Sequence, residues 1–458
     1  MLLSSKIWIN HLIISLVLLS YGSFVIAANN EIAFVNVDVV HPESNQIDRS
    51  QTVIVSGKKI KKIGSAKKFD LEPLIKIIDG DGLYLMPGLV EMHAHVPKVS
   101  QGQEYLEDML FLWVANGITT IRNMSGEPAH LQVRAKLNNQ EILGPRMFTA
   151  GPPFQGKKIK TAEEAKTIVK KQASAGYDFL KVHMGLPLIT YDGVVSGSSE
   201  VGIAFAGHVS NDIGLWRALE AGQKSIDHLD SYLPAIVAEN SDISRVKDSL
   251  LGMPYTPFVD PKKIRLVAEA TAKAGTWNAP TLTLAKNFIT PFDESSVLLG
   301  SQYMPPKMIR GWANIAKGFQ KTITDPLMAE EFLNYRMQLV KALQDAGAGL
   351  LLGSDAPQVM NIPGFSTHNE LALMVESGLS PAEALTAGTV NAAIYFDEEE
   401  TFGRIEENLS ADFLIVRGNP LNNISTLKKP VGVMLQGRWL PSEEINKKLE
   451  KIALKYLE

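Results

Sequence analysis

Two histidines separated by one residue follow an apolar segment that contains a proline and a glycine. His93 and His95 lie at the end of the stretch 85–95, and residues 89–92 separate them from Pro87 and Gly88. Side chains on a β-strand alternate between its two faces, so both imidazoles of such a strand point the same way. Histidine is the commonest metal ligand, and a catalytic metal needs several converging ligands with one position open. The segment therefore predicts two ligands of a metal site, and the remaining chain must supply the others.

Composition limits what else such a site contains. The 458 residues include no cysteine, which excludes disulfides, thiolate ligands and a cysteine nucleophile. Any metal must therefore be held by His, Asp, Glu or a modified Lys. Hydrophobic residues at 45% and charged residues at 21% are typical of a globular protein. The formal net charge of -4 gives no electrostatic reason to expect nucleic acid as a partner.

The first 28 residues have the pattern of a secretory signal peptide. A lysine precedes an apolar run over 12–19, and small residues at 25–28 resemble a cleavage site after Ala27 or Ala28. An uncleaved anchor helix is the alternative, but polar residues interrupt the run before it reaches about 20 apolar residues. We therefore expect residues 1–28 to be a signal peptide, and the protein to be periplasmic or secreted without a stable membrane anchor.

Short segments of alternating polarity occur near both ends of the chain. They cover 33–39 and 52–56 at one end and 411–416 and 431–436 at the other. We expect them to form one composite β-sandwich domain, built from 29–86 together with 401–440. The last segment, 441–458, has an apolar stripe at helical spacing, which favours a C-terminal helix that packs on its own barrel or on a partner. An oligomer is therefore left open.

Between these blocks, over 87–400, helical patterns alternate with short apolar strands. The predicted strands are 85–95, 118–124, 147–151, 179–184, 203–209, 225–229, 277–284 and 350–354. Eight such units in series favour an α/β fold, a (β/α)8 TIM barrel, and no glycine-rich phosphate-binding pattern opens any of the helices. One weak point is 186–201, where Gly193 and Gly197 are expected to weaken the fourth helix by about 1 kcal/mol each.

Four more polar residues are expected at the barrel end where His93 and His95 lie. Each follows a helix-ending glycine by about one strand length, which brings it to the carboxyl end of its strand. These residues are Lys181, His208, His228 and Asp355. Each also has an ordinary structural reading: a buried histidine with satisfied hydrogen bonds, a lysine paired with Asp355, or an aspartate that caps a turn before Pro357. Their number at one barrel end favours a site.

These motifs together resemble a known superfamily. The segments that carry the resemblance are 86–95, 117–124, 178–182, 206–209, 225–229 and 353–357, with 403–405 and 411–414 in the sheet domain. They are similar to the amidohydrolase superfamily, and most similar to its imidazolonepropionase-like and Xaa-Pro dipeptidase-like branch. The likeness extends over about 32–440, and as a set the motifs are highly specific.

The resemblance implies a site and a mechanism. Its metal ligands would be His93, His95, His208, His228 and Asp355, and Lys181 matches the position that is carboxylated where two metals are bound. Zn²⁺ is expected, one or two per chain, although other divalent metals suit such ligands. The metal would lower the pKa of bound water from about 15.7 toward about 7. Asp355 would accept the proton of that water and return it to the leaving nitrogen, and His228 would assist it.

The expected function is that of an exported metal-dependent amidohydrolase that cleaves amide or peptide C–N bonds, such as a dipeptidase-like enzyme acting on a dipeptide or another small molecule. A cyclic amidohydrolase is an alternative, as is a mononuclear deaminase with an unmodified Lys181 and His228 as proton shuttle. From another class, an inactive barrel could act as a binding protein, but no ligand is missing from the sequence. Candidate substrate-binding residues are Arg122, His183 and His368, each of which could equally make a structural hydrogen bond or ion pair.

Overall fold

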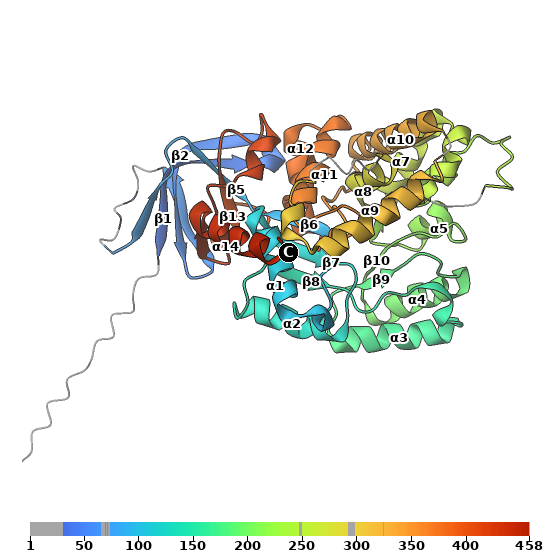
Figure 1. Cartoon of the computed structure of the whole chain (residues 1–458), viewed down its shortest axis with the longest axis horizontal. Helices are drawn as coiled ribbons and strands as arrows, with labels where there is room; N and C mark the ends of the chain where they lie inside the picture. Colours follow the sequence, from blue (N-terminus) through green and yellow to red (C-terminus); the bar gives the residue numbers. More distant parts are fainter. Residues whose placement is uncertain are drawn as a thin grey trace, which may run out of the picture.

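The computed structural model describes residues 31–65, 69, 71, 74–246, 250–291, 298–323 and 325–457 (Figure 1). The expected signal peptide, 1–28, lies outside these residues. Within them the chain forms a sheet domain at one end of the molecule and a larger α/β domain beside it. No helix in the described ranges is long and apolar enough to cross a lipid bilayer.

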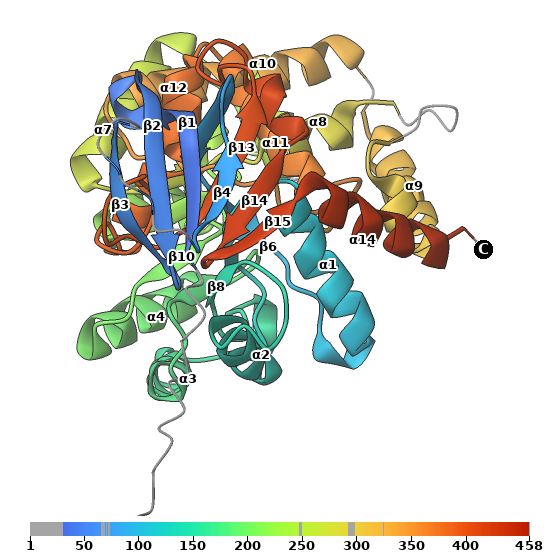
Figure 2. The ribbon, with the colours of Figure 1, turned by 90° about the vertical axis from the view of Figure 1, so that its left-hand side faces the viewer.

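The sheet domain is built from both ends of the chain (Figure 2). Its order is β15-β14-β13-β5-β1-β2-β3, and β4 also pairs with β1. The strands are β1 (Ile32–His41), β2 (Gln46–Ser56), β3 (Lys59–Ser65), β4 (Lys76–Asp79), β5 (Leu83–Pro87), β13 (Phe413–Arg417), β14 (Gly432–Leu435) and β15 (Arg438–Pro441). The antiparallel pair β5 and β13 joins the two ends of the chain. Phe34 packs edge-on against Phe413 and Trp439 in the core, with ring centroids 5.2 and 5.0 Å apart.

The larger domain is the predicted barrel. Its strands are β6 (Leu89–Ala94), β7 (Ile118–Asn123), β8 (Arg146–Thr149), β9 (Leu180–Val182), β10 (Phe205–Gly207), β11 (Ser225–Asp227) and β12 (Trp277–Ala279). They form two parallel sheets, β6-β7-β8 and β9-β10-β11-β12. Parallel bridges join the two sheets at both edges. On one edge Ala150 pairs with Phe179. On the other edge the segment 350–356 takes the place of the eighth strand, because Leu350 pairs with Asn278 and Ala356 pairs with Ala94. The fold class predicted from the sequence is confirmed.

Helices surround the barrel strands. They are α1 (Gln103–Ala115), α2 (Pro128–Asn138), α3 (Ala162–Ala175), α4 (Leu188–Val201), α5 (Gly214–Glu220), α6 (Tyr232–Ala235), α7 (Ile264–Ala274), α8 (Leu282–Ile289), α9 (Pro306–Gln320), α10 (Pro326–Asp345), α11 (Phe365–Glu376), α12 (Pro381–Ala387) and α13 (Val390–Tyr395). The last helix, α14 (Ser442–Lys455), lies next to α1.

The seventh predicted strand is too long. We expected it to cover 277–284, but it ends at Ala279, because Thr281 adopts a left-handed conformation (φ +47°) and α8 begins at Leu282. The carboxylate of Glu370 accepts hydrogen bonds from the backbone N–H groups of Leu282 and Thr283 at 2.8 and 2.7 Å. A carboxylate that caps the first turn of a helix satisfies N–H groups that otherwise lack partners, and this long-range contact overrides the local apolar pattern.

The expected weakening of the fourth helix is also wrong. Helix α4 is continuous through Gly193 and Gly197 and packs against α3. A Cβ atom on Gly193 would lie 2.6 Å from both the Cα and the carbonyl oxygen of Ala162, and one on Gly197 would lie 3.1 Å from the Cα of Lys166. The glycines therefore permit a close approach of two helices, and the packing offsets their low helix propensity.

Replacing Gly193 with alanine should lower the free energy of unfolding by about 1 to 3 kcal/mol, because the added methyl group would press on the backbone of α3. Gly311 in α9 is the matched control, since a Cβ there would meet nothing within 4 Å. Alanine at that position should stabilise the protein by about 0.5 to 1 kcal/mol. Urea denaturation of both variants would measure the two changes, and equal effects would contradict the packing role of Gly193.

Candidate metal centre

Three of the predicted ligands form a compact group. His93 is in β6, His95 follows that strand, and Asp355 follows the eighth strand position. One nitrogen or oxygen atom from each of the three lies within 4.8 Å of those of the other two. The Nε2 atom of His95 is 2.8 Å from Oδ1 of Asp355, and the Nε2 atom of His93 is 3.4 Å from the same oxygen. The structure thus brings these side chains together at the carboxyl ends of the strands, where barrel active sites form.

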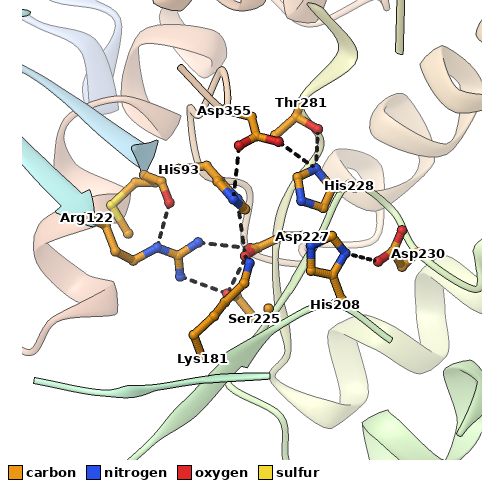
Figure 3. A network of polar contacts seen from close by, with 12 residues as sticks. His93, Arg122, Lys181, His208, Ser225, Asp227, His228, Asp230, Thr281 and Asp355 are labelled. Atoms are coloured by element: carbon orange, nitrogen blue, oxygen red, sulfur yellow. Dashed lines mark hydrogen bonds and ion pairs between the residues drawn. The ribbon is translucent and has the colours of Figure 1, made fainter. Parts of the chain in front are cut away.

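The two other predicted histidines lie next to this group (Figure 3). The ring of His228 is 4.5 Å from those of His93 and His208, measured between centroids. Nδ1 of His208 is 2.7 Å from Oδ2 of Asp230, and Nδ1 of His228 is 2.8 Å from Oγ1 of Thr281. Such partners fix the orientation of the ring and leave Nε2 available for a metal. Five predicted ligands therefore lie in one continuous cluster.

Several nitrogen and oxygen atoms of the cluster that could bind a metal make no hydrogen bond within the described chain. They are Nδ1 and Nε2 of His93, Nε2 of His228 and Oδ1 of Asp355, all buried. The nitrogens of His93 and the oxygen of Asp355 lie 2.8 to 3.4 Å from ionisable neighbours, but without the geometry of a hydrogen bond. Burial lowers the pKa of His93 to about 4, so its imidazole is neutral and presents a lone pair. A buried polar atom without a hydrogen bond lowers the stability of the fold. Several such atoms with lone pairs that face one another can be satisfied by a cation bound between them. The donor set therefore fits a divalent metal.

The backbone at two of these residues lies in an unusual region. His228 has φ +60° and Asp355 has φ +66°, values that side-chain-bearing residues rarely adopt. His228 directly follows β11 and Asp355 directly precedes the bridge between Ala356 and Ala94, so the left-handed conformation redirects the chain at the barrel end. Strained conformations of this kind cluster at active sites and ligand clamps.

Lys181 is buried beneath the histidines and points toward Asp227. Its side chain is 1% exposed, and its Nζ atom is 3.4 Å from Oδ2 of Asp227. Burial lowers the pKa of the lysine, which increases the fraction of neutral amine. Gly207 makes room for it, because a Cβ there would lie 2.7 Å from the Cδ atom of Lys181. Whether Lys181 is carboxylated stays a prediction.

Arg122 does not have the placement that we predicted for a substrate-binding residue. It is fully buried inside the barrel, and every terminal nitrogen has a partner within the protein. Its Nη2 donates to Asp227 at 2.9 Å, and its Nη1 donates to the hydroxyl groups of Ser225 and Tyr395, each at 2.8 Å. Its Nε donates to the carbonyl of Met92 at 2.5 Å. A guanidinium saturated in this way cannot bind a substrate carboxylate, so that expectation is wrong.

Asp227 is the residue that the sequence reasoning missed. It is fully buried, it pairs with both Arg122 and Lys181, and its Oδ2 is 3.2 Å from Nδ1 of His93. The charge of Arg122 holds its pKa well below the usual range, against the effect of burial. Its position carried a signal, because Ser225 and Asp227 are two residues apart on one strand and therefore share the interior face.

Glu91 was also missed. Its carboxylate is fully buried and accepts hydrogen bonds from the backbone N–H groups of His93 and Ser354 at 2.9 and 2.8 Å. The hydroxyl groups of Ser354 and Thr367 donate to it at 2.6 and 2.7 Å. The contacts fix β6 against the chain just before Asp355. Glu91 therefore holds two parts of the cluster in register without entering it.

The two histidines predicted to bind substrate have different surroundings. His183 is partly exposed, and its ring lies 4.6 Å from that of His208, at the edge of the cluster. It remains a candidate for substrate binding. His368 lies in α11 and its Nε2 donates to the carbonyl of Asn116 at 3.0 Å. Asn116 lies just before β7, at the amino end of a barrel strand, so His368 is not in this site and that expectation is wrong.

The buried His368 should make stability depend on pH. Burial lowers its pKa to about 4 in the folded state, below the ordinary value of 6.5 for histidine. The unfolded chain therefore binds a proton first as the pH falls, and stability present above about pH 6.5 is lost toward pH 4. At about 1.4 kcal/mol per unit, the loss from this residue is about 3 kcal/mol. Urea denaturation at pH 7 and pH 4 should show a smaller decrease for His368→Gln than for the wild type, whereas equal decreases would contradict the assignment.

A family model supplies independent information on the chain. The model of the amidohydrolase family matches residues 84–440, which include every member of the cluster. The chain belongs to the amidohydrolase family. The superfamily predicted from the motifs is thus confirmed, and membership supports the predicted class of enzyme, a hydrolase that acts on carbon–nitrogen bonds.

Individual known proteins resemble parts or all of this amidohydrolase. A 5'-deoxyadenosine deaminase from Methanocaldococcus jannaschii is 43% identical over 49 residues, 11% of each chain. An ochratoxinase from Aspergillus niger is 33% identical over 90 residues, 19% of this chain and 18% of the fungal protein. The matched segments thus span less than a fifth of either curated relative. A solved Xaa-Pro dipeptidase with bound methionine has a TM-score of 0.66 at 19% identity, and the match covers 90% of this chain and 100% of that chain, so the two share a fold.

Proposed function

We propose that this amidohydrolase is an exported, metal-dependent enzyme that hydrolyses amide or peptide C–N bonds in small substrates, in the manner of a dipeptidase. The observation that carries the proposal is the cluster of five predicted ligands, in which nitrogen and oxygen atoms of His93, His228 and Asp355 are buried and make no hydrogen bond of good geometry. The similarity to the solved Xaa-Pro dipeptidase supports a peptide-like substrate.

The residues of the cluster have separable roles in this reaction. A divalent metal held by them would acidify the attacking water and polarise the carbonyl group of the substrate. Asp355 accepts the proton of that water and returns it to the leaving nitrogen. Its backbone N–H donates to the carbonyl of His93 at 2.9 Å, which keeps the carboxylate beside the histidines. Asp230 and Thr281 hold His208 and His228 with their Nε2 atoms free.

A second metal would depend on Lys181. Its neutral amine can react with carbon dioxide to form a carbamate and release a proton, and the lowered pKa favours that amine. In the structure the amine instead lies 3.4 Å from Asp227. We propose Zn²⁺ as the metal, with two ions where Lys181 is carboxylated and one where it is not.

The second candidate is a mononuclear deaminase. It is favoured by the compact group of His93, His95 and Asp355, by the pairing of Lys181 with Asp227, and by the short match to a deaminase. In this enzyme Lys181 would remain an ordinary cation, and His228 would transfer protons. A site of this kind would hold one metal per chain.

Metal analysis separates these readings. The purified protein is stripped with a chelator, reloaded with Zn²⁺ and desalted, and its metal content is measured by elemental mass spectrometry. Two ions per chain, with an added carboxylate mass at Lys181, are expected for the binuclear hydrolase, and Lys181→Met should then retain one ion. One ion in both proteins would favour the deaminase. A chain that binds no stoichiometric metal would be the inactive binding protein.

Substrate assays test the reaction class. Zinc-loaded protein is offered Xaa-Pro and other dipeptides, N-acyl amino acids and cyclic amides, with a purine nucleoside as the deamination probe. Release of free amino acid from a dipeptide or an N-acyl amino acid is expected. Release of ammonia from the nucleoside alone would overturn the hydrolase reading and support the deaminase. The stripped protein is the control for each substrate.

Export is tested separately, because it does not depend on the reaction. The full chain is produced in a Gram-negative bacterium, and the N-terminus of the periplasmic protein is sequenced. A mature chain that begins at Ala28 or Asn29 is expected from the signal-like pattern. An intact N-terminus on membrane-bound protein would support an anchor instead.

A further inference from the structure

A cavity of about 720 Å³ lies away from the metal centre. Its wall is formed by the end of α1, the short helix η7 (Ser301–Tyr303), the start of α11, the chain around η8 (Ile424–Lys428) and one face of α14. Figure 2 shows α14 beside α1 at the edge of the sheet domain. No residue of the cluster lines this cavity. Its volume is in the range of small-molecule sites.

Several residues that line the cavity are apolar or aromatic. Tyr303 and Phe365 stack with their ring centroids 5.6 Å apart and their planes inclined by 21°. Leu299, Ile445 and Leu449 also line the cavity. Leu299 is 54% exposed, which is high for a leucine beside other apolar groups. Such a wall can accept an apolar or aromatic body of a ligand.

Three residues that line the cavity are positively charged. Arg417, Lys428 and Lys429 line it, and its lining residues include no aspartate or glutamate. All three cations are exposed, and none of them has an ion pair or side-chain hydrogen bond with any part of the described chain. His368 is also part of the wall, and its buried Nδ1 has no hydrogen-bond partner within the described residues. The cavity therefore combines unpaired positive charge with an apolar surface.

We infer that this cavity binds a small amphipathic carboxylate, a molecule with one anionic head and an aromatic or aliphatic body. The lysines and the arginine would meet the carboxylate, and the body would cover Tyr303, Phe365 and the leucines. Inorganic phosphate fits less well, because it would leave the apolar lining residues exposed to water. A long acidic peptide also fits less well, because the volume suits a ligand of drug size. The site is separate from the metal centre, and its occupancy does not depend on which reaction that centre performs.

Isothermal titration calorimetry on the zinc-loaded full chain tests this inference, with indole-3-propionate as the probe. Two control compounds each lack one part of this probe. 3-(Indol-3-yl)propan-1-ol keeps the indole ring but has no carboxylate, and propionate keeps the carboxylate but has no ring. Each should bind at least about tenfold more weakly than the complete probe, since losing an ion pair or the buried ring costs more than about 1.4 kcal/mol. Equal binding of the neutral alcohol would overturn the inference.

Variants locate the bound probe. K428A/K429A removes two cations, and Leu449→Trp fills the cavity from α14; each should weaken binding by about tenfold or more. K447A/K451A is the matched control, because these two lysines of α14 lie outside the cavity, and its affinity should equal that of the wild type. Asp355→Asn should also bind normally. Loss of binding in Asp355→Asn, with no change in K428A/K429A, would place the carboxylate at the metal centre and overturn the inference. Thermal melts confirm that each variant is folded.

Discussion

Replacing Asp355 with asparagine should lower kcat by about 10³-fold or more, because the variant cannot accept a proton from the attacking water. The carboxylate is 2% exposed, and its Oδ1 lies close to the Nε2 atoms of both His93 and His95. Asparagine has nearly the same shape, so the geometry is kept while the charge is lost. The substrate used is the compound from the assay panel that the wild type cleaves fastest.

The control for this prediction is Asp345→Asn. Asp345 is an exposed residue at the end of α10 that pairs with Lys341 and has no contact with the cluster among its ion pairs. Its kcat should equal that of the wild type. Metal content is measured for both variants, because a lower content in Asp355→Asn alone would show that the carboxylate also holds the ion. An Asp355→Asn enzyme with more than a tenth of the wild-type kcat would contradict the assignment of Asp355 as the general base.

The sequence was a good guide to the barrel ends for a simple physical reason. Strand length, glycine-ended helices and the alternation of side chains are local properties, and they place His93, His208 and Asp355 at one face without knowledge of distant contacts. The same local rules predicted that both ends of the chain would meet in one sheet. Only the register of β5 against β13, which joins them, required the structure.

The errors arose where contacts between distant segments decide the outcome. Glu370 starts α8 where the pattern continued as a strand, and the close contact with Ala162 explains Gly193 in α4. The wrong prediction that Arg122 binds substrate has the same cause. An arginine at a strand end near a site suggests a substrate partner, but Asp227 lies 105 residues away in sequence and on another strand of the barrel. No local pattern specifies such a pair.

The Arg122 and Asp227 pair connects the barrel core to the metal centre. One oxygen of Asp227 accepts a hydrogen bond from Arg122, and the other faces both Lys181 and His93 at 3.4 and 3.2 Å. The arginine therefore decides how much negative charge Asp227 presents to the lysine. A carbamate on Lys181 would face this carboxylate with a like charge, so Arg122 would favour the proposed carboxylation by partly neutralising Asp227.

Replacing Arg122 with methionine should therefore be strongly destabilising. The change removes the bonds from the guanidinium to Asp227, Ser225, Tyr395 and the Met92 carbonyl, and it leaves a fully buried carboxylate with a weaker partner. Breaking one side of a buried ion pair costs about 3 to 5 kcal/mol. Urea denaturation of the metal-stripped chain measures the change, because bound metal would add its own stabilisation.

Two comparisons test whether the buried charge causes that loss. Arg134→Met removes an arginine that pairs with Asp178 at the surface, where both side chains are partly exposed, and it should cost no more than about 1 kcal/mol. R122M/D227L replaces both buried partners with apolar groups, and it should recover part of the stability because the buried carboxylate is gone. Lys181 then loses its contact with Asp227, so R122M/D227L/K181M is measured beside it to remove that amine as well. If both the double and the triple variant are less stable than Arg122→Met, packing around the guanidinium dominates over charge, and Arg122 then acts by filling the barrel core.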